Sequence, residues 1–114
     1  MFKHKEQMDH SEETGVHGGV GMVEITKVLD KQDKCKGIRF LHDDIIPPGS
    51  SIGEHLHERK PEIYYCASGR GKLILDGEEM EMRQGDISVC GKGHSHGLVN
   101  DSGEVLRLIV IRPK

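Results

Sequence analysis

The sequence predicts an all-β fold, a barrel or jelly roll built from short antiparallel strands. Apolar and polar residues alternate over several short segments, which is the pattern of strands with one buried face. Glycine, proline, asparagine and aspartate residues separate these segments, and such residues favour tight turns. Little of the chain has the spacing of an amphipathic helix, and no internal repeat is present. Together these observations favour a single domain made of hairpins.

Three strands are expected in the first half of the chain. Met22 to Val28 alternates apolar and polar residues, and Ile38 to Ile46 is apolar at its ends. Pro47-Pro48-Gly49 ends the second of these strands, because proline cannot donate to a strand ladder and glycine favours a turn. The third strand carries His55 and His57.

Six further strands are expected in the second half, each bounded by turn residues. Asp76-Gly77 is the preferred dipeptide of a two-residue hairpin. Gly69-Arg70-Gly71 precedes a strand rather than a helix, so we interpret it as a hairpin turn and not as a nucleotide-binding loop. The expected strands are Glu62 to Ala67, Lys72 to Leu75, Glu78 to Met82, Ile87 to Cys90, His96 to Asn100 and Val105 to Ile111.

The N-terminal residues are too polar and charged to belong to a core. We predict a flexible N-terminal arm over residues 1–14, either mobile or lent as a strand to a partner, and a single barrel domain over residues 15–114. The glycine-rich segment around His17 lacks the lysine, the serine or threonine and the following helix that a phosphate-binding loop requires.

Composition indicates a small barrel with a thin core. Of the 114 residues, 34% are hydrophobic and 31% are charged, and there is no tryptophan. A barrel with so few large apolar side chains gains buried area by association, so a homodimer is expected. Cys35, Cys66 and Cys90 are odd in number and have no C-x-x-C spacing, so they are interpreted as small core residues.

Charge and hydropathy argue against two classes of partner. A net charge of −3 gives no positive field for nucleic acid. No apolar stretch approaches the length of a membrane span, and the N-terminus has no apolar region of the kind found in secretion signals. We therefore expect a cytoplasmic protein that binds neither nucleic acid nor membrane.

Four residues have the spacing of a metal site. Strand alternation puts His55 and His57 on the same face of one strand. A turn containing Pro61 returns the chain at Glu62, and His96 comes from a later segment. Three imidazoles and one carboxylate that meet inside a barrel bind a divalent metal. The alternative is a set of solvated or core histidines. It does not explain why four possible ligands have the spacing that brings them together.

These residues resemble the two signatures of the cupin superfamily. The first runs from Gly49 through His55, His57 and Glu62 to Gly69 and is complete. The resemblance implies a double-stranded β-helix with His55, His57, Glu62 and His96 as metal ligands, most similar to small single-domain cupins of the germin and oxalate decarboxylase type. The residues that match the second signature are Gly85, Gly91-Lys92-Gly93, His96 and Asn100, and Gly91 stands where the family has proline. Glycine there predicts a looser approach to His96.

The ligand set determines what the metal can do. Four protein ligands on an octahedral ion leave two open positions, and one carboxylate on a divalent ion leaves a positive charge. Such a site suits an anionic or sugar-like small molecule, with the metal as Lewis acid or redox centre. Mn, Fe, Ni, Co and Zn all fit these ligands, and the sequence does not choose among them.

Other polar residues are candidates for substrate contacts. Tyr64 follows Glu62 by two residues and shares its face, so it either orients a ligand or fills the core. Arg39 either clamps a carboxylate or is solvated. His42 with Asp43 and Asp44 is expected as an outward charged cluster. His94 is expected to be exposed, and Asn100 to bond the backbone of a turn.

Two functions remain open from the sequence, and no catalytic residue beyond the metal ligands can be named. The first is a metal-dependent enzyme acting on a carboxylate or polyhydroxy substrate, as a decarboxylase, dioxygenase, isomerase or lyase. The second is a non-catalytic module that binds or senses a small ligand, with a structural metal. Open coordination positions beside a roomy polar pocket favour catalysis or ligand capture, and a closed coordination shell favours a structural metal.

Overall fold

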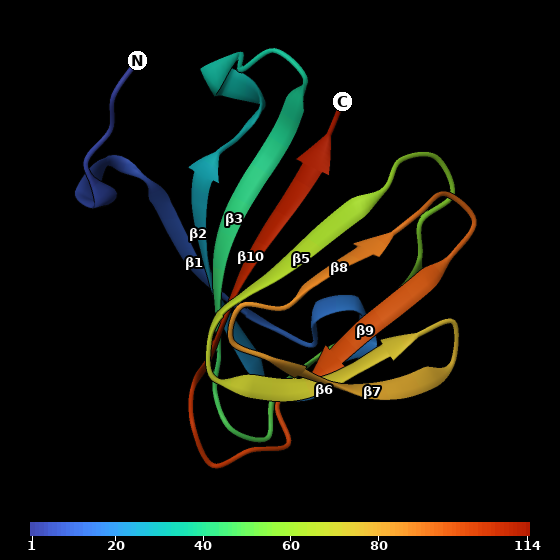
Figure 1. Cartoon of the computed structure of the whole chain (residues 1–114). Helices are drawn as coiled ribbons and strands as arrows, with labels where there is room; N and C mark the ends of the chain where they lie inside the picture. Colours follow the sequence, from blue (N-terminus) through green and yellow to red (C-terminus); the bar gives the residue numbers. More distant parts are fainter.

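Two antiparallel β-sheets face each other across the core (Figure 1). In this computed structural model, which describes residues 1–114, the six-stranded sheet has the order β1-β2-β3-β10-β5-β8. The four-stranded sheet has the order β4-β9-β6-β7. This is the double-stranded β-helix, or jelly roll, that the sequence predicts, and the all-β fold class is confirmed.

The predicted strands match the observed strands to within two residues at each end. The observed elements add three single turns of 3-10 helix and one N-terminal strand. In chain order they are η1 (Lys5–Gln7), β1 (Asp9–Thr14), η2 (Val16–Gly18), β2 (Met22–Leu29), η3 (Lys31–Asp33), β3 (Ile38–Ile46), β4 (Ser51–Leu56), β5 (Glu62–Ser68), β6 (Arg70–Leu75), β7 (Glu78–Arg83), β8 (Ile87–Cys90), β9 (Ser95–Val99) and β10 (Leu106–Pro113).

The N-terminal segment differs from the flexible arm that its composition suggests. Asp9–Thr14 forms β1 and pairs antiparallel with β2 of the same chain, from Asp9 opposite Lys27 to Thr14 opposite Met22. Nearly all of its side chains are exposed, so backbone hydrogen bonds rather than apolar burial hold the strand. The exchange of this strand with a second copy stays a prediction.

The hairpin between β6 and β7 has the predicted turn. Asp76 and Gly77 both have positive φ, 51° and 81°, as a type I′ turn requires. Leu75 and Glu78 pair directly across this turn. The dipeptide therefore sets the register of the whole hairpin.

The core between the sheets consists of medium-sized side chains, as the composition predicts. A cluster of 12 buried residues fills it, with Tyr64 as its largest member. Cys66 lies within this cluster and Cys90 is also buried, whereas Cys35 is half-buried, and all three cysteines are free. Asn100 closes one end by donating to the carbonyl oxygens of Ile46 at 2.8 Å and Glu104 at 2.7 Å, which confirms its backbone-bonding role. None of the helices could cross a membrane.

The segment around η2 is held against β4 by two glycines. A β-carbon built on Gly53 would lie 2.0 Å from the carbonyl oxygen of His17, and one on Gly19 would lie 2.2 Å from that of Ser51. Val20 and Ser51 form two hydrogen bonds of 2.8 Å. The backbone N–H of Val20 donates to the hydroxyl of Ser51, and the backbone N–H of Ser51 donates to the carbonyl oxygen of Val20. Because only glycine permits this approach, the two glycines fix the position of His17.

Gly53→Ala tests this packing. We expect it to lower the free energy of unfolding by about 2 kcal/mol or more, because the new methyl group collides with backbone that cannot move independently. Urea denaturation followed by circular dichroism measures the change. The matched control is Gly103→Ala, where a β-carbon meets nothing within 4 Å. Its expected effect is below about 1 kcal/mol, and an equal loss in the two variants would contradict the close packing.

Candidate metal centre

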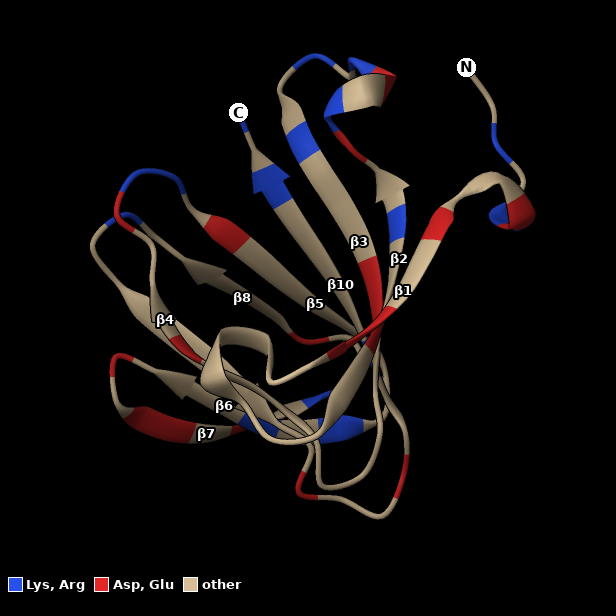
Figure 2. Cartoon of the chain, turned by 180° about the vertical axis from the view of Figure 1, so that it is seen from behind, with Lys and Arg blue, Asp and Glu red and all other residues tan.

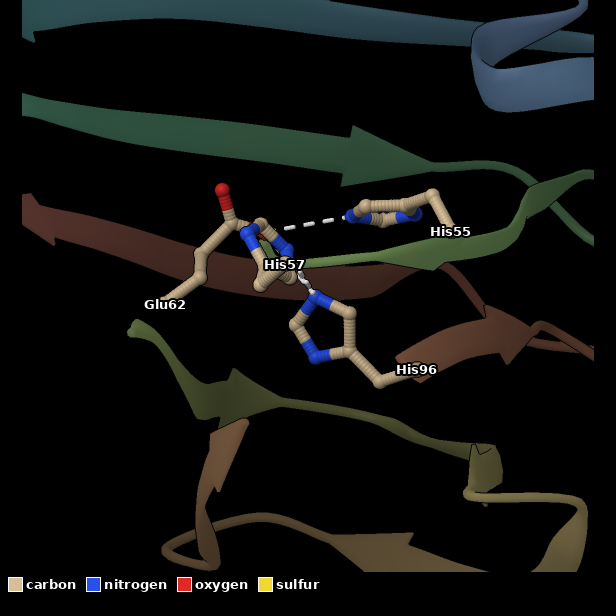
Figure 3. Close-up of side chains that lie close together, drawn as sticks. All are labelled: His55, His57, Glu62 and His96. Carbon is tan, nitrogen blue, oxygen red and sulfur yellow. Dashed lines mark hydrogen bonds and ion pairs between the residues drawn. The ribbon is translucent and has the colours of Figure 1, made fainter. Parts of the chain in front are cut away.

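The four predicted ligands come from both sheets and meet between them (Figure 3). His55 lies in β4 and His96 in β9, and the two are direct cross-strand partners. His57 directly follows β4, and Glu62 is the first residue of β5 in the opposite sheet. The structure thus brings together residues that are up to 41 positions apart in the chain, 55 to 96.

The ligand atoms are close enough to share one ion. The Nε2 atoms of His57 and His96 are 3.0 Å apart, and Oε1 of Glu62 lies 3.0 Å from Nε2 of His96. The corresponding distances from Glu62 to His57 and His55 are 3.3 and 3.5 Å. Ligands about 2.1 Å from an ion are about 3.0 Å apart at a right angle and about 3.4 Å apart at the tetrahedral angle. The cluster is therefore able to hold a divalent metal.

The charge and orientation of the cluster also suit a cation. Nδ1 of His55 donates to the carbonyl oxygen of Gly53 at 2.8 Å, which leaves Nε2 free to point at the other ligands. Burial opposes ionisation of Glu62, but hydrogen bonds from His55 and His96 hold the pKa of its carboxyl well below the usual range. A buried carboxylate whose only ion-pair partners are three histidines matches a bound cation.

Backbone contacts hold the loop ahead of His96. His57 donates its N–H to the carbonyl oxygen of His94 at 3.0 Å, and Gly93 donates to the carbonyl oxygen of His57 at 2.7 Å. The loop that contains Gly91 is thus joined to the end of β4. His94 is exposed as expected, and its Nδ1 lies 2.6 Å from Oδ2 of Asp76.

A cavity of about 270 Å³ is lined by three of the four candidate ligands, while His96 is fully buried behind it. His55, His57 and Glu62 line it, as does His17, whose ring stacks on that of His55 with centroids 3.7 Å apart. Apolar side chains of both sheets cover much of the remaining wall. The polar residues from β3 and β10 that face the cavity are His42, Asp44 and Arg112.

The two predicted substrate contacts occupy different places. Tyr64 is 1% exposed, lines the cavity and stacks on the ring of His96 with centroids 4.1 Å apart. Arg39 is exposed and does not line this cavity. Its neighbour Phe40 does, because alternation along β3 turns the even-numbered residues inward.

The same alternation corrects the expected outward cluster of His42, Asp43 and Asp44. Only Asp43 is directed away from the cavity, where Arg107 of β10 donates to it at 2.7 Å. His42 and Asp44 face inward. The sequence analysis missed these two residues, together with His17 and Arg112. Strand alternation places Phe40, His42 and Asp44 on the same face of β3. The sequence alone does not show whether that face is the inner or the outer one.

Asp44 is in an unusual state for a carboxyl group. It is 5% exposed and its Oδ1 has no hydrogen-bond partner. Burial, with smaller contributions from the negative charges of Glu62, Asp43 and Glu13, raises the pKa of Asp44 to about 8. The carboxyl group is therefore protonated in most molecules at neutral pH.

Comparison with known proteins identifies the family. The family model described as "Cupin domain" matches residues 43–112. The chain belongs to the cupin family. The match begins in β3 and ends in β10, so it includes all four candidate ligands of this cupin.

Individual relatives agree with this assignment. An oxalate-binding protein of Thermotoga maritima is 32% identical over 98 residues, which cover 86% of this cupin and 81% of the relative. A crystal structure from the same species, described as a predicted oxalate decarboxylase, superposes with a TM-score of 0.92 at 28% identity over 99% of this chain and 98% of that one. A polyketide cyclase from Streptomyces resistomycificus shares the fold, with a TM-score of 0.78 at 24% identity over 99% of this chain and 80% of the cyclase.

Metal binding is tested by removing one ligand. We expect His96→Ala to weaken binding of Mn²⁺ or Zn²⁺ by at least about 100-fold in titration calorimetry, because it removes a central ligand. The wild-type protein should lose thermal stability when a chelator is added, since bound metal stabilises only the folded state. His94→Ala is the control, because His94 is exposed and bonded to Asp76. Equal metal affinity in the three proteins would refute this site.

Asp44 predicts a specific dependence of stability on pH. Between its ordinary pKa of 3.8 and about 8, the folded state retains a proton that the unfolded state releases, so the contribution of Asp44 to stability falls as pH rises. The negative charges of Glu62, Asp43 and Glu13 strengthen this effect.

Asp44→Asn removes the titrating group. Its stability relative to wild type should increase by on the order of 2 kcal/mol from pH 5 to pH 8, in thermal unfolding at a fixed metal concentration. Asp43→Asn, on the outward side of the same strand, should show no such increase. A pH-independent difference for Asp44→Asn would show that the carboxyl group titrates normally.

Proposed function

We propose that this cupin is a metal-dependent enzyme acting on a small carboxylate or polyhydroxy substrate. The observation that carries the proposal is the position of the ligand cluster, because three of its members, His55, His57 and Glu62, line a cavity of about 270 Å³. A purely structural metal needs no such cavity, whereas a catalytic one needs room beside it.

The residues divide the work between holding a metal and shaping the cavity. His55, His57, Glu62 and His96 would hold a divalent transition metal, one of Mn, Fe, Ni, Co or Zn. When bound, the metal supplies Lewis-acid or redox chemistry to an oxygen-bearing ligand. Tyr64 forms part of the cavity floor beside His96, where its ring fixes the orientation of that imidazole and limits the space for a substrate.

Charge supports an anionic or sugar-like substrate. A divalent ion outweighs the single negative charge of Glu62, and Arg112 adds a guanidinium to the same cavity. The Thermotoga maritima relative is named an oxalate-binding protein, and the crystal structure from that species is described as a predicted oxalate decarboxylase. Decarboxylase, dioxygenase, isomerase and lyase reactions all fit this chemistry.

The alternative is a module that binds or senses a small ligand without converting it, with a structural metal. The relative described as an oxalate-binding protein favours this reading, because its printed name specifies binding only. The two functions use the same four ligands and the same cavity. They differ in whether a bound acid is chemically changed.

We also propose that the protein acts as a homodimer in the cytoplasm. The outer faces of β5 and β8 are apolar, and β8 carries no charged residue (Figure 2). Ile87 and Val89 are 65% and 56% exposed, and they pair with Tyr65 and Ile63. Each copy carries a net charge of −3, but this apolar face brings no like charges together when two copies meet there. Three free cysteines fit a reducing compartment.

Incubation of the metal-loaded protein with a panel of carboxylates, 2-oxo acids and sugar acids tests the function. We expect turnover of at least one of them, detected by NMR of the product, and loss of that turnover in His57→Ala. His94→Ala should remain active because it leaves the ligand cluster intact. Binding of a panel member without conversion would support the alternative module, and binding of none would contradict both functions.

Sedimentation equilibrium tests the dimer. The expected mass is about twice the 12.7 kDa of one chain. Val89→Lys should shift the mass toward that of one chain, because it places a charge in the apolar face. Met80→Lys, at an exposed apolar position of β7 in the other sheet, should leave the dimer intact. A wild-type protein of 12.7 kDa would exclude the dimer.

A further inference from the structure

Two polar atoms in the cavity wall are buried without a partner. One is Oδ1 of Asp44 and the other is Nε of Arg112. Both residues line the cavity beside the metal ligands. Buried polar atoms in folded proteins nearly always have hydrogen-bond partners, so these two exceptions beside one cavity mark side chains whose hydrogen bonding the protein itself does not satisfy.

The two residues lie at different depths of the cavity. Arg112 of β10 pairs with Phe40 of β3, and Asp44 of β3 pairs with Leu108 of β10. Four residues along the strand separate these two pairs, which is a distance of about 14 Å at a rise of about 3.4 Å per residue. The two side chains therefore contact different parts of any ligand that fills the cavity.

Arg112 lies at the level of the metal ligands. Its neighbour Ile111 pairs with Ile63, which follows Glu62 in the chain. Arg112 also lines, with His55 and His57, a second depression of the surface. A guanidinium in this position matches a carboxylate that is bound at the metal, because its N–H groups form a fork that fits two oxygens.

Asp44 lies at the deep end, where a second negative charge is unfavourable. Its surroundings include the carboxylates of Glu62 and Glu13, and burial already disfavours its own charged form. A protonated carboxyl group carries no charge and exchanges hydrogen bonds with a hydroxyl or carbonyl group. A carboxylate placed beside it is disfavoured by burial and by the negative charges of Glu62 and Glu13. His42 lies between the two ends of the cavity, and burial lowers the pKa of its imidazole, so it is neutral and can bond to a hydroxyl group.

We propose that Asp44 forms a distal subsite that selects a monocarboxylic acid with a hydroxylated chain, held at its acidic end by Arg112 and the metal. The inference rests on the proposed function, since it places the acidic end at the metal site. Beyond the proposed function, the inference specifies the chain length of the substrate and the position of its negative charge. A two-carbon acid such as oxalate reaches only the metal end, and a dicarboxylate of full length brings a carboxylate against Asp44.

Three acids that share a 2-hydroxycarboxylate end test the subsite. Glycolate has only this end, gluconate adds a hydroxylated chain, and glucarate has the same length as gluconate but ends in a second carboxylate. Calorimetric titration of the protein loaded with Zn²⁺, which has no redox chemistry, measures binding without redox turnover. We expect gluconate to bind at least about 10-fold more tightly than glycolate, and glucarate to lose most of that gain, since a hydrogen-bonded end is worth about 1.4 kcal/mol or more.

Variants separate the two ends. Asp44→Leu should reduce gluconate affinity to that of glycolate while leaving glycolate affinity unchanged. Asp44→Asn, whose amide can still hydrogen-bond to a hydroxyl group, should keep most of the gluconate affinity. Arg112→Gln should lower the affinities for glycolate and for gluconate by the same factor. The controls are Asp43→Asn and Arg107→Gln, which alter the outward pair on the same two strands and should change neither affinity.

The outcomes distinguish this inference from the proposed function. Failure of the wild-type protein to bind Zn²⁺ would overturn both. Binding of Zn²⁺ without binding of any of the three acids would overturn the distal subsite alone. Equal affinities for glycolate and gluconate would overturn only the distal subsite. Unchanged gluconate affinity in both Asp44 variants would also overturn it and would show that Asp44 contacts water alone.

Discussion

The convergence of one carboxylate and three imidazole nitrogens between the two sheets is the constraint on which the rest of the structure depends. Glu62 is buried, and its ion-pair partners are His55, His57 and His96. A buried carboxylate destabilises a protein unless positive charge compensates for it. Three imidazole nitrogens aimed at the same point match a cation that would supply this compensation. Such a cation would join the two sheets at this point, in addition to apolar packing.

Much of the fold serves to bring these groups together. The pairing of His55 with His96 fixes two ligands across β4 and β9, and the backbone bonds of His57 to the loop before His96 add a third. Gly53 has two roles, because its carbonyl oxygen orients His55 and its missing side chain admits the backbone of His17. The thin core lies beside this cluster and leaves the cavity open along β3 and β10.

The sequence allowed the local parts of this arrangement to be predicted, but not those that depend on pairing. Alternation put His55 and His57 on one face, and Asp76-Gly77 specified its turn. The pairing of β1 was missed because a polar strand held by backbone bonds has no apolar signal. His42 and Asp44 were expected to face outward, since a run of polar residues does not reveal which side of its strand is buried. His17 approaches His55 only through contacts between glycines distant in the sequence.

The most direct test is a crystal structure of the protein grown with Mn²⁺ or Zn²⁺, with anomalous diffraction measured at the absorption edge of the metal. The account predicts one strong peak about 2.0–2.3 Å from the three Nε2 atoms and Oε1 of Glu62, with a non-protein ligand facing the cavity. A cluster without such a peak, or an ion whose shell is closed by protein groups alone, would contradict it.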